Sequence, residues 1–128
     1  MIVDIQNDYC TGTMAIEGAL DIVPMINELK RNKMFDHVFT ARDWHPSNHV
    51  SFQSNHPGTQ QFETIKVKET GLDQIMWPKH CVQGSRGAQY VDGLDINDSD
   101  IEIFKGRKER IDAISAFGSD QEDTSLLK

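Results

Sequence analysis

The chain is poor in the features that mark several classes of protein. It has two cysteines among its 128 residues, and no apolar run approaches the ~18 residues that a membrane-spanning helix needs. The start also lacks the charged region and apolar region of a secretory signal. We therefore expect a cytoplasmic protein without a membrane partner. Cys10 and Cys81 could pair, but cytoplasmic thiols stay reduced, so we expect both to be free.

Basic residues are also scarce. The chain has 13 lysines and arginines against 20 aspartates and glutamates, which gives a formal net charge of -7. Nucleic-acid binding normally needs a clustered basic face, so this composition argues against a nucleic-acid partner. With 38% hydrophobic residues, the chain is long enough for one domain with a modest core.

Short apolar segments and one helical pattern suggest an α/β fold. Residues 2–5 are β-branched around an aspartate, and residues 37–43 and 100–106 are short, apolar and β-rich. Between the first two, residues 19–34 place apolar side chains at helical spacing and end in basic residues. The order strand, helix, strand predicts a parallel sheet with crossover helices.

The remaining segments predict loops. Residues 44–62 are rich in His, Asn, Ser, Pro and Gly without periodicity, and a loop of that length is usually functional. Near the end, a polar linker precedes a helix start at Thr124 or Ser125, three residues before the sequence stops. Three strands make a small sheet, so we expect a truncated version of a longer domain.

Charged side chains follow the predicted strands. Asp4 lies near the end of the first strand, where α/β proteins bind ligands, although an aspartate there could equally cap a turn. Asp43 and His45 are two residues apart at the end of another strand, so extended backbone directs both to one side. With His80, they form a sufficient ligand set for Zn²⁺, Fe²⁺ or Mn²⁺, while an incidental surface pair is the alternative.

Two further histidines lie in the long polar loop. Because the residues around His49 and His56 are polar, we expect both side chains to be solvated.

Four segments carry a family resemblance. "DIQNDYC", "TARDWHPSNHVSF", "WPKHCVQGSRGAQ" and "FKG" followed by "SAF" occur in this order and together resemble the nicotinamidases of the isochorismatase-like cysteine hydrolases. The resemblance implies a three-layer Rossmann-like parallel sheet with flanking helices. It implies that residues 1–128 are the N-terminal portion of one isochorismatase-like hydrolase domain whose C-terminal part is missing. The implied reaction converts nicotinamide and water to nicotinate and ammonia in NAD salvage, and a homo-oligomer is compatible with it.

The resemblance also assigns roles to residues. Asp4 falls on the family's general base, and Lys105 on the lysine that holds the nucleophilic thiolate and orients that base. The other assignments are the metal ligands Asp43, His45 and His80, with zinc the common metal, Asp112 reaching the metal through water, and Tyr9 and Trp77 as walls of the pyridine site.

One part of the family site has no counterpart. The family nucleophile is a cysteine in a loop that opens a later helix, and this sequence ends before it. We expect Cys81 and Cys10 to be buried spectators and the chain alone to be inactive. Two alternatives stay open: another hydrolase of the superfamily, such as an isochorismatase or a carbamoyl amidohydrolase, and a non-catalytic metal-binding remnant that partners full-length subunits.

Overall fold

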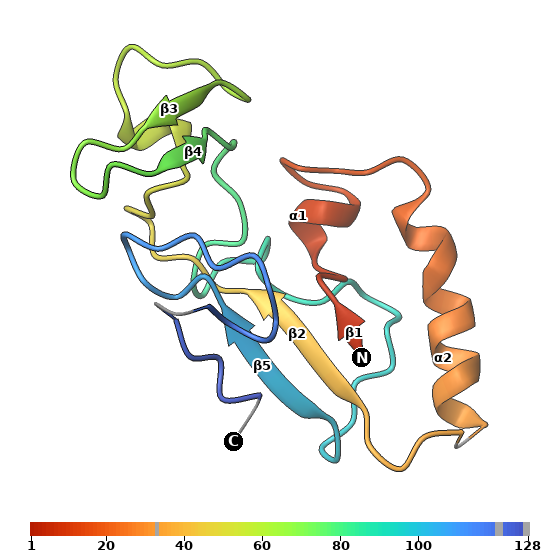
Figure 1. Ribbon diagram of the computed structural model, residues 1–128. Helices are drawn as coiled ribbons and strands as arrows, with labels where there is room; N and C mark the ends of the chain where they lie inside the picture. The colour runs from red at the N-terminus through yellow and green to blue at the C-terminus, as the bar shows by residue number, and fades with distance from the viewer. Residues whose placement is uncertain (33, 120–121, 127–128) are drawn as a thin grey trace.

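The computed structural model describes residues 1–32, 34–119 and 122–126. Its centre is a parallel sheet of three strands, β1 (Ile2–Val3), β2 (Phe39–Asp43) and β5 (Ile101–Lys105), in the order β1-β2-β5 (Figure 1). In register, Val3 is opposite Ala41, and Asp43 is opposite Lys105. The predicted parallel α/β sheet is therefore confirmed, and its strands end together at one edge.

The longest helix of the described residues packs beside β1. The 3-10 turn η1 (Ala19–Ile22) leads into α2 (Val23–Arg31), which has a proline in its first turn and two basic residues in its last. Proline and basic residues suit those two ends, because the first N–H groups need no helical partner and the C-terminus is negatively polarised. The prediction of a helix within residues 19–34 is thus confirmed for the centre of that range. The predicted range extends beyond α2 at both ends.

Two small clusters of buried apolar residues pack on opposite sides of the sheet. The cluster beneath α2 consists of Ile5, Cys10, Val23, Val91 and Leu94. The other consists of Ala41, Ile103 and Ala116, with Phe39 and Leu126 packed against it. Irregular C-terminal segments supply this second cover rather than a helix (Figure 1).

The structure contains elements that the sequence patterns did not predict. A one-turn helix, α1 (Asn7–Cys10), follows β1 directly. The long loop contains the 3-10 turn η2 (Gln53–Asn55), and an antiparallel hairpin, β3 (Thr64–Lys66) with β4 (Asp73–Ile75), follows it. The hairpin lies beyond the ends of β2 and β5 (Figure 1).

The expected helix start near the C-terminus is wrong for the residues that are described. Thr124 is not helical, and its hydroxyl donates a hydrogen bond to the carbonyl of Ala116 at 2.5 Å. Ser125 has a left-handed φ of 66°, which a helix does not tolerate. Residues 127–128 of the predicted helix lie outside the described residues. Within the described part of the chain, no helix is long and apolar enough to cross a membrane.

Candidate active site

The carboxyl ends of the three parallel strands bring the predicted site residues together. Asp4 follows β1, Asp43 ends β2 and Lys105 ends β5. All eight residues to which the sequence analysis gave a role line one cavity: Asp4, Tyr9, Asp43, His45, Trp77, His80, Lys105 and Asp112. Ligands of α/β proteins bind at this edge of the sheet, so the fold itself positions the candidate site.

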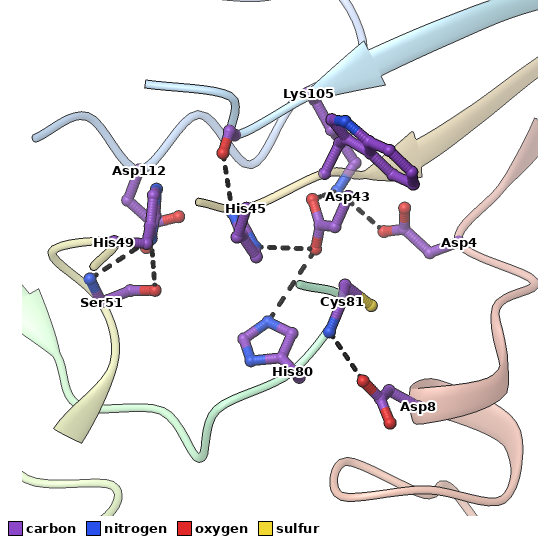
Figure 2. Close-up of polar contacts among 12 residues, drawn as sticks. Asp4, Asp8, Asp43, His45, His49, Ser51, His80, Cys81, Lys105 and Asp112 are labelled. Atoms are coloured by element: carbon purple, nitrogen blue, oxygen red, sulfur yellow. Dashed lines mark hydrogen bonds and ion pairs between the residues drawn. The ribbon is translucent and has the colours of Figure 1, made fainter. Parts of the chain in front are cut away.

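A lysine joins two carboxylates at the base of the cavity. Lys105 Nζ lies 2.5 Å from Asp43 Oδ1 and 2.9 Å from Asp4 Oδ2, and the lysine is 2% exposed (Figure 2). Burial would lower the pKa of Lys105, but the charges of Asp43 and Asp4 outweigh it and raise that pKa. The ammonium therefore stays charged and holds both carboxylates in place.

The two carboxylates have different pKa values because their partners differ. Burial raises the pKa of Asp4 to about 6, against the opposing charge of Lys105. Burial would also raise the pKa of Asp43, but a hydrogen bond from His45 and the charge of Lys105 hold it below its usual range. Asp43 is thus a permanent anion, and Asp4 can exchange a proton near neutral pH.

Asp4 also has an unusual backbone. Its φ is 59°, in the left-handed region that non-glycine residues seldom adopt. The strand predicted over residues 2–5 therefore ends at Val3, and the turn at Asp4 directs its side chain towards Lys105. Oδ1 of Asp4 is buried and has no hydrogen-bond partner among the described residues. A buried, unpaired acceptor in strained backbone is typical of a functional residue.

The residues Asp43, His45 and His80 fit a divalent metal ion. One ligand atom of each lies within 4.8 Å of the others, and all three are buried. His45 Nε2 is 3.4 Å and His80 Nε2 is 4.0 Å from Asp43 Oδ2 (Figure 2). One carboxylate and two imidazoles are a common ligand set for zinc with an open position.

Hydrogen bonds orient both imidazoles for such a role. Nδ1 of His45 lies 2.8 Å from the carbonyl of Gly106, and Nδ1 of His80 lies 2.6 Å from that of Pro78. A carbonyl only accepts, so each Nδ1 carries a proton, and in the neutral imidazole each Nε2 has the lone pair that a metal ion needs. In the metal-free protein burial would lower the pKa of His45, but Asp43 outweighs it, and the protonated ring donates from Nε2 to Asp43. Backbone carbonyls are the usual outer partners of metal-binding histidines.

The two aromatic residues and Asp112 lie at the rim of the metal cluster. Tyr9 donates a hydrogen bond from its hydroxyl to Asp43 Oδ2, and its ring lies edge-on to His80 at 5.5 Å between centroids. Trp77 is half-buried. Asp112 accepts a hydrogen bond of 2.7 Å from Gln74, which belongs to β4. The hairpin that the sequence patterns missed therefore helps to fix Asp112.

His49 is not solvated, and that prediction is wrong. Its side chain is fully buried, and its ring lies against that of His45, tilted by 34° with centroids 4.2 Å apart. Nδ1 pairs with the hydroxyl of Ser51 at 2.8 Å, and Nε2 lies 3.0 Å from the carbonyl of Ile111. Burial and the neighbouring His45 lower the pKa of His49 to about 4, so it is neutral at pH 7. The polar composition of the loop concealed this packing.

His56, the other histidine of the loop, is half-buried, and its ring forms a hydrogen bond with the backbone carbonyl of Val50.

Gln6 is a positioning residue that the sequence analysis missed. It is fully buried and forms three hydrogen bonds: its amide nitrogen donates to the carbonyls of Asp43 and Ala88, and its oxygen accepts the N–H of Asp43. The side chain thus binds Asp43 as a neighbouring strand would. The only signal in the sequence was a run of polar residues directly after a buried strand.

Both cysteines are buried free thiols, as expected. Burial raises the pKa of Cys81, and the nearby Asp43 and Asp8 raise it further. Burial raises the pKa of Cys10 as well. Thiolates are the reactive form of cysteine, so neither residue has the environment of a nucleophile.

Known proteins are similar to this chain in sequence and in fold. No protein-family model matches the chain. The chain is 41% identical over 126 residues to the nicotinamidase of Acinetobacter baylyi. The alignment covers 98% of this chain and 57% of that protein. A solved Acinetobacter baumanii nicotinamidase pyrazinamidease superposes with a TM-score of 0.82 and 44% identity, covering 91% and 55% of the two chains. A Pyrococcus horikoshii pyrazinamidase solved in complex with zinc superposes with a TM-score of 0.69 and 29% identity over 91% and 55%.

These likenesses extend over nearly all of the present chain but not over all of the relatives. The chain spans just over half the length of the curated nicotinamidase and of the two solved structures. Identity and fold agree over that span, and the chain therefore belongs to the nicotinamidase family.

Proposed function

We propose that residues 1–128 are the N-terminal portion of a metal-assisted nicotinamidase, which hydrolyses nicotinamide to nicotinate and ammonia in cytoplasmic NAD salvage. The observation that carries the proposal is the charge network of Asp4, Lys105 and Asp43, which borders the cluster of Asp43, His45 and His80. The proposal is also supported by the 41% sequence identity between this chain and a curated nicotinamidase.

Asp43, His45 and His80 would hold the metal, for which we propose zinc, with iron or manganese as the other candidates. A bound divalent ion would supply Lewis acidity beside the pyridine nitrogen and make the amide carbon more electrophilic. Asp112 lies in the same cavity and would reach the ion through water. Tyr9 and Trp77 would hold the pyridine ring by stacking.

Asp4 and Lys105 would carry the proton chemistry. With a pKa of about 6, Asp4 can accept a proton from a thiol and return it to the departing ammonia. Its unpaired Oδ1 is available for that exchange. Lys105 would stabilise the resulting negative charge on the thiolate, since its own ammonium stays protonated.

The nucleophile would come from outside these residues. Cys81 is buried and its pKa is raised, so it is a poor substitute. A site without its covalent nucleophile loses most of its rate, because the catalytic groups act as a unit. We therefore expect the 128-residue polypeptide alone to release no ammonia from nicotinamide above background.

A chimera tests the proposal. Residues 1–128 replace the matching part of the Acinetobacter baylyi nicotinamidase, so that the relative supplies the remainder, and ammonia release from nicotinamide is measured. We expect turnover in the chimera and a loss of about 100-fold or more on Asp4→Asn, the usual contribution of a general base. Asp92→Asn, at an exposed carboxylate, is the matched control and should leave the rate unchanged.

Two results would contradict the proposal. A folded, zinc-loaded chimera that releases no ammonia would favour the non-catalytic metal-binding alternative. Ammonia release by the 128-residue polypeptide itself would direct attention to Cys81 as the nucleophile.

A further inference from the structure

A carboxylate that the proposed reaction does not use lies just behind the metal cluster. Asp8 belongs to α1, and its Oδ2 accepts the backbone N–H of Cys81 at 2.7 Å, across 73 positions in the sequence (Figure 2). Asp8 is not satisfying the N–H groups of its own helix with that oxygen. The bond joins the segment after β1 to the residue that immediately follows His80.

The backbone at that point needs to be held. Cys81 has a φ of 47°, in the left-handed region, and it is not a glycine. Such a conformation is strained for a residue with a side chain and persists only where neighbouring groups enforce it. Cys81 is fully buried, so no water can satisfy its N–H in place of Asp8. A hydrogen bond to a carboxylate is stronger than one to a neutral acceptor and offsets part of that strain.

The surroundings of Asp8 fit its carboxylate closely. The backbone N–H of Asp8 donates to the carbonyl of Gly87 at 3.0 Å. A Cβ atom added to Gly87 would overlap the carboxylate of Asp8, and one added to Gly12 would overlap both that carboxylate and the Cα of Asp8. Gly87 does not have a positive φ, so its lack of a side chain serves this approach and not a turn.

We propose that Asp8 is a positioning residue for His80. By fixing the Cys81 peptide, Asp8 fixes the backbone from which the His80 ring projects, and the bond from Nδ1 of His80 to the Pro78 carbonyl then sets the direction of Nε2. Gln6 holds Asp43 through its backbone in the same manner. This inference rests on the proposed metal centre and adds the residue that orders one of its ligands.

Metal affinity and the spectrum of bound Co²⁺ test this role without any turnover. Co²⁺ is titrated into the 128-residue protein in competition with a chromophoric chelator, and its visible absorption reports the ligand geometry. We expect Asp8→Ala to weaken Co²⁺ binding by about 10-fold or more, the order of loss seen when the residues that orient metal ligands are removed, and to alter the spectrum. Gly87→Ala should reproduce both effects, because the added methyl group displaces the carboxylate. Asp8→Asn keeps an acceptor oxygen and should lie between wild type and Asp8→Ala.

Asn7→Ala is the matched control. The Asn7 amide donates to the carbonyls of Arg86 and Gln89, so this variant loses bonds from the same segment without touching a ligand-bearing residue. It should keep the wild-type Co²⁺ affinity and spectrum even if its melting temperature falls. A second readout uses the metal-free protein: alkylation of Cys81, located by peptide mass spectrometry, should be faster in Asp8→Ala than in Asn7→Ala.

The outcomes separate two failures. If the wild type binds Co²⁺ and folded Asp8→Ala binds it with the same affinity and spectrum, the positioning role is wrong and the metal centre stands. If the wild type itself binds no Co²⁺, the metal centre of the proposed function is wrong, and the role of Asp8 in serving it is wrong too.

Discussion

The ammonium of Lys105 lies 2.5 Å from Oδ1 of Asp43, the carboxylate that we propose as a metal ligand. The same nitrogen lies 2.9 Å from Asp4, the proposed general base. The proton-transfer residues and the metal ligands are therefore one buried network and not two neighbouring sites. A change in one carboxylate alters the electrostatic environment of the other through Lys105.

Lys105→Met should destabilise the metal-free protein strongly. It leaves Asp43, a buried anion, without its cation, and breaking a buried pair typically costs about 3–5 kcal/mol. Urea denaturation at pH 7 measures the loss. Lys66→Met is the matched control, because Lys66 forms a solvent-exposed pair with Asp73 and should change stability by less than about 1 kcal/mol. Equal losses in the two variants would refute the network.

Asp4 should make the metal-free protein less stable as pH rises from about 4 to about 6. Its pKa is 3.8 when unfolded and about 6 when folded, so the folded state binds the proton more tightly. The stabilising contribution of the protonated group is complete below pH 4 and is lost through pH 6. His49 titrates in the same interval with the opposite sign, because its pKa falls to about 4.

The comparison of wild type with Asp4→Asn isolates the contribution of Asp4. We compare the free energy of unfolding of the variant with that of the wild type at each pH. The difference, variant minus wild type, should rise by about 2 kcal/mol between pH 4 and pH 7, since one pKa unit corresponds to 1.36 kcal/mol. Urea denaturation at several pH values measures it. A difference that does not change with pH would show that Asp4 has the same pKa in both states.

The sequence predicted the parallel strands and the pair of Asp43 and His45 because both depend on local pattern. β-branched residues mark β1 and β5, β2 is a short segment that begins with Phe39 and Thr40, and chemically distinctive side chains stand at the strand ends. The spacing of Asp43 and His45 follows from extended backbone alone. Bringing His80 to them is a tertiary event that no local spacing reveals. The donor chemistry of His80 suggested it as the third ligand, and the family resemblance assigned it that role.

The supporting residues could not be predicted because their roles depend on distant backbone. Gln6 and Asp8 bond to atoms 37 and 73 positions away, and no local period reveals such partners. His49 was misjudged since a polar loop can be buried when its own side chains satisfy it, as Ser51 does here. The β3–β4 hairpin was missed because each of its strands has only three residues.

The 128-residue protein should associate as its concentration rises. Within the described residues, β1 and β5 are edge strands, and Val3 and Ile101 on them are 43% and 44% exposed. Unpaired apolar edges favour pairing with a second chain. Val3→Lys should reduce the association measured by light scattering, while Ile16→Lys, at an exposed apolar residue outside the sheet, should not. A monodisperse wild-type monomer with a sharp two-state melt would contradict this expectation.

Zinc should bind with about one ion per chain, and substitution of a proposed ligand should abolish most of that binding. After dialysis against buffer with zinc and then without it, the metal content of wild type is compared with that of His45→Ala and His80→Ala. Both variants should retain little zinc. His56→Ala is the control, because that imidazole bonds to the Val50 carbonyl and does not belong to the ligand cluster.

Acid should release the zinc through His45 first. Burial would lower the pKa of His45, but Asp43 outweighs it and raises that pKa, whereas burial lowers the pKa of His80. A proton on either imidazole competes with the metal, so zinc affinity should fall as pH drops, with His45 the first to protonate. Equal, near-stoichiometric zinc in the wild type and in the three histidine variants of the dialysis experiment would place the ion elsewhere. Asp43, His45 and His80 would then be a polar cluster without a metal.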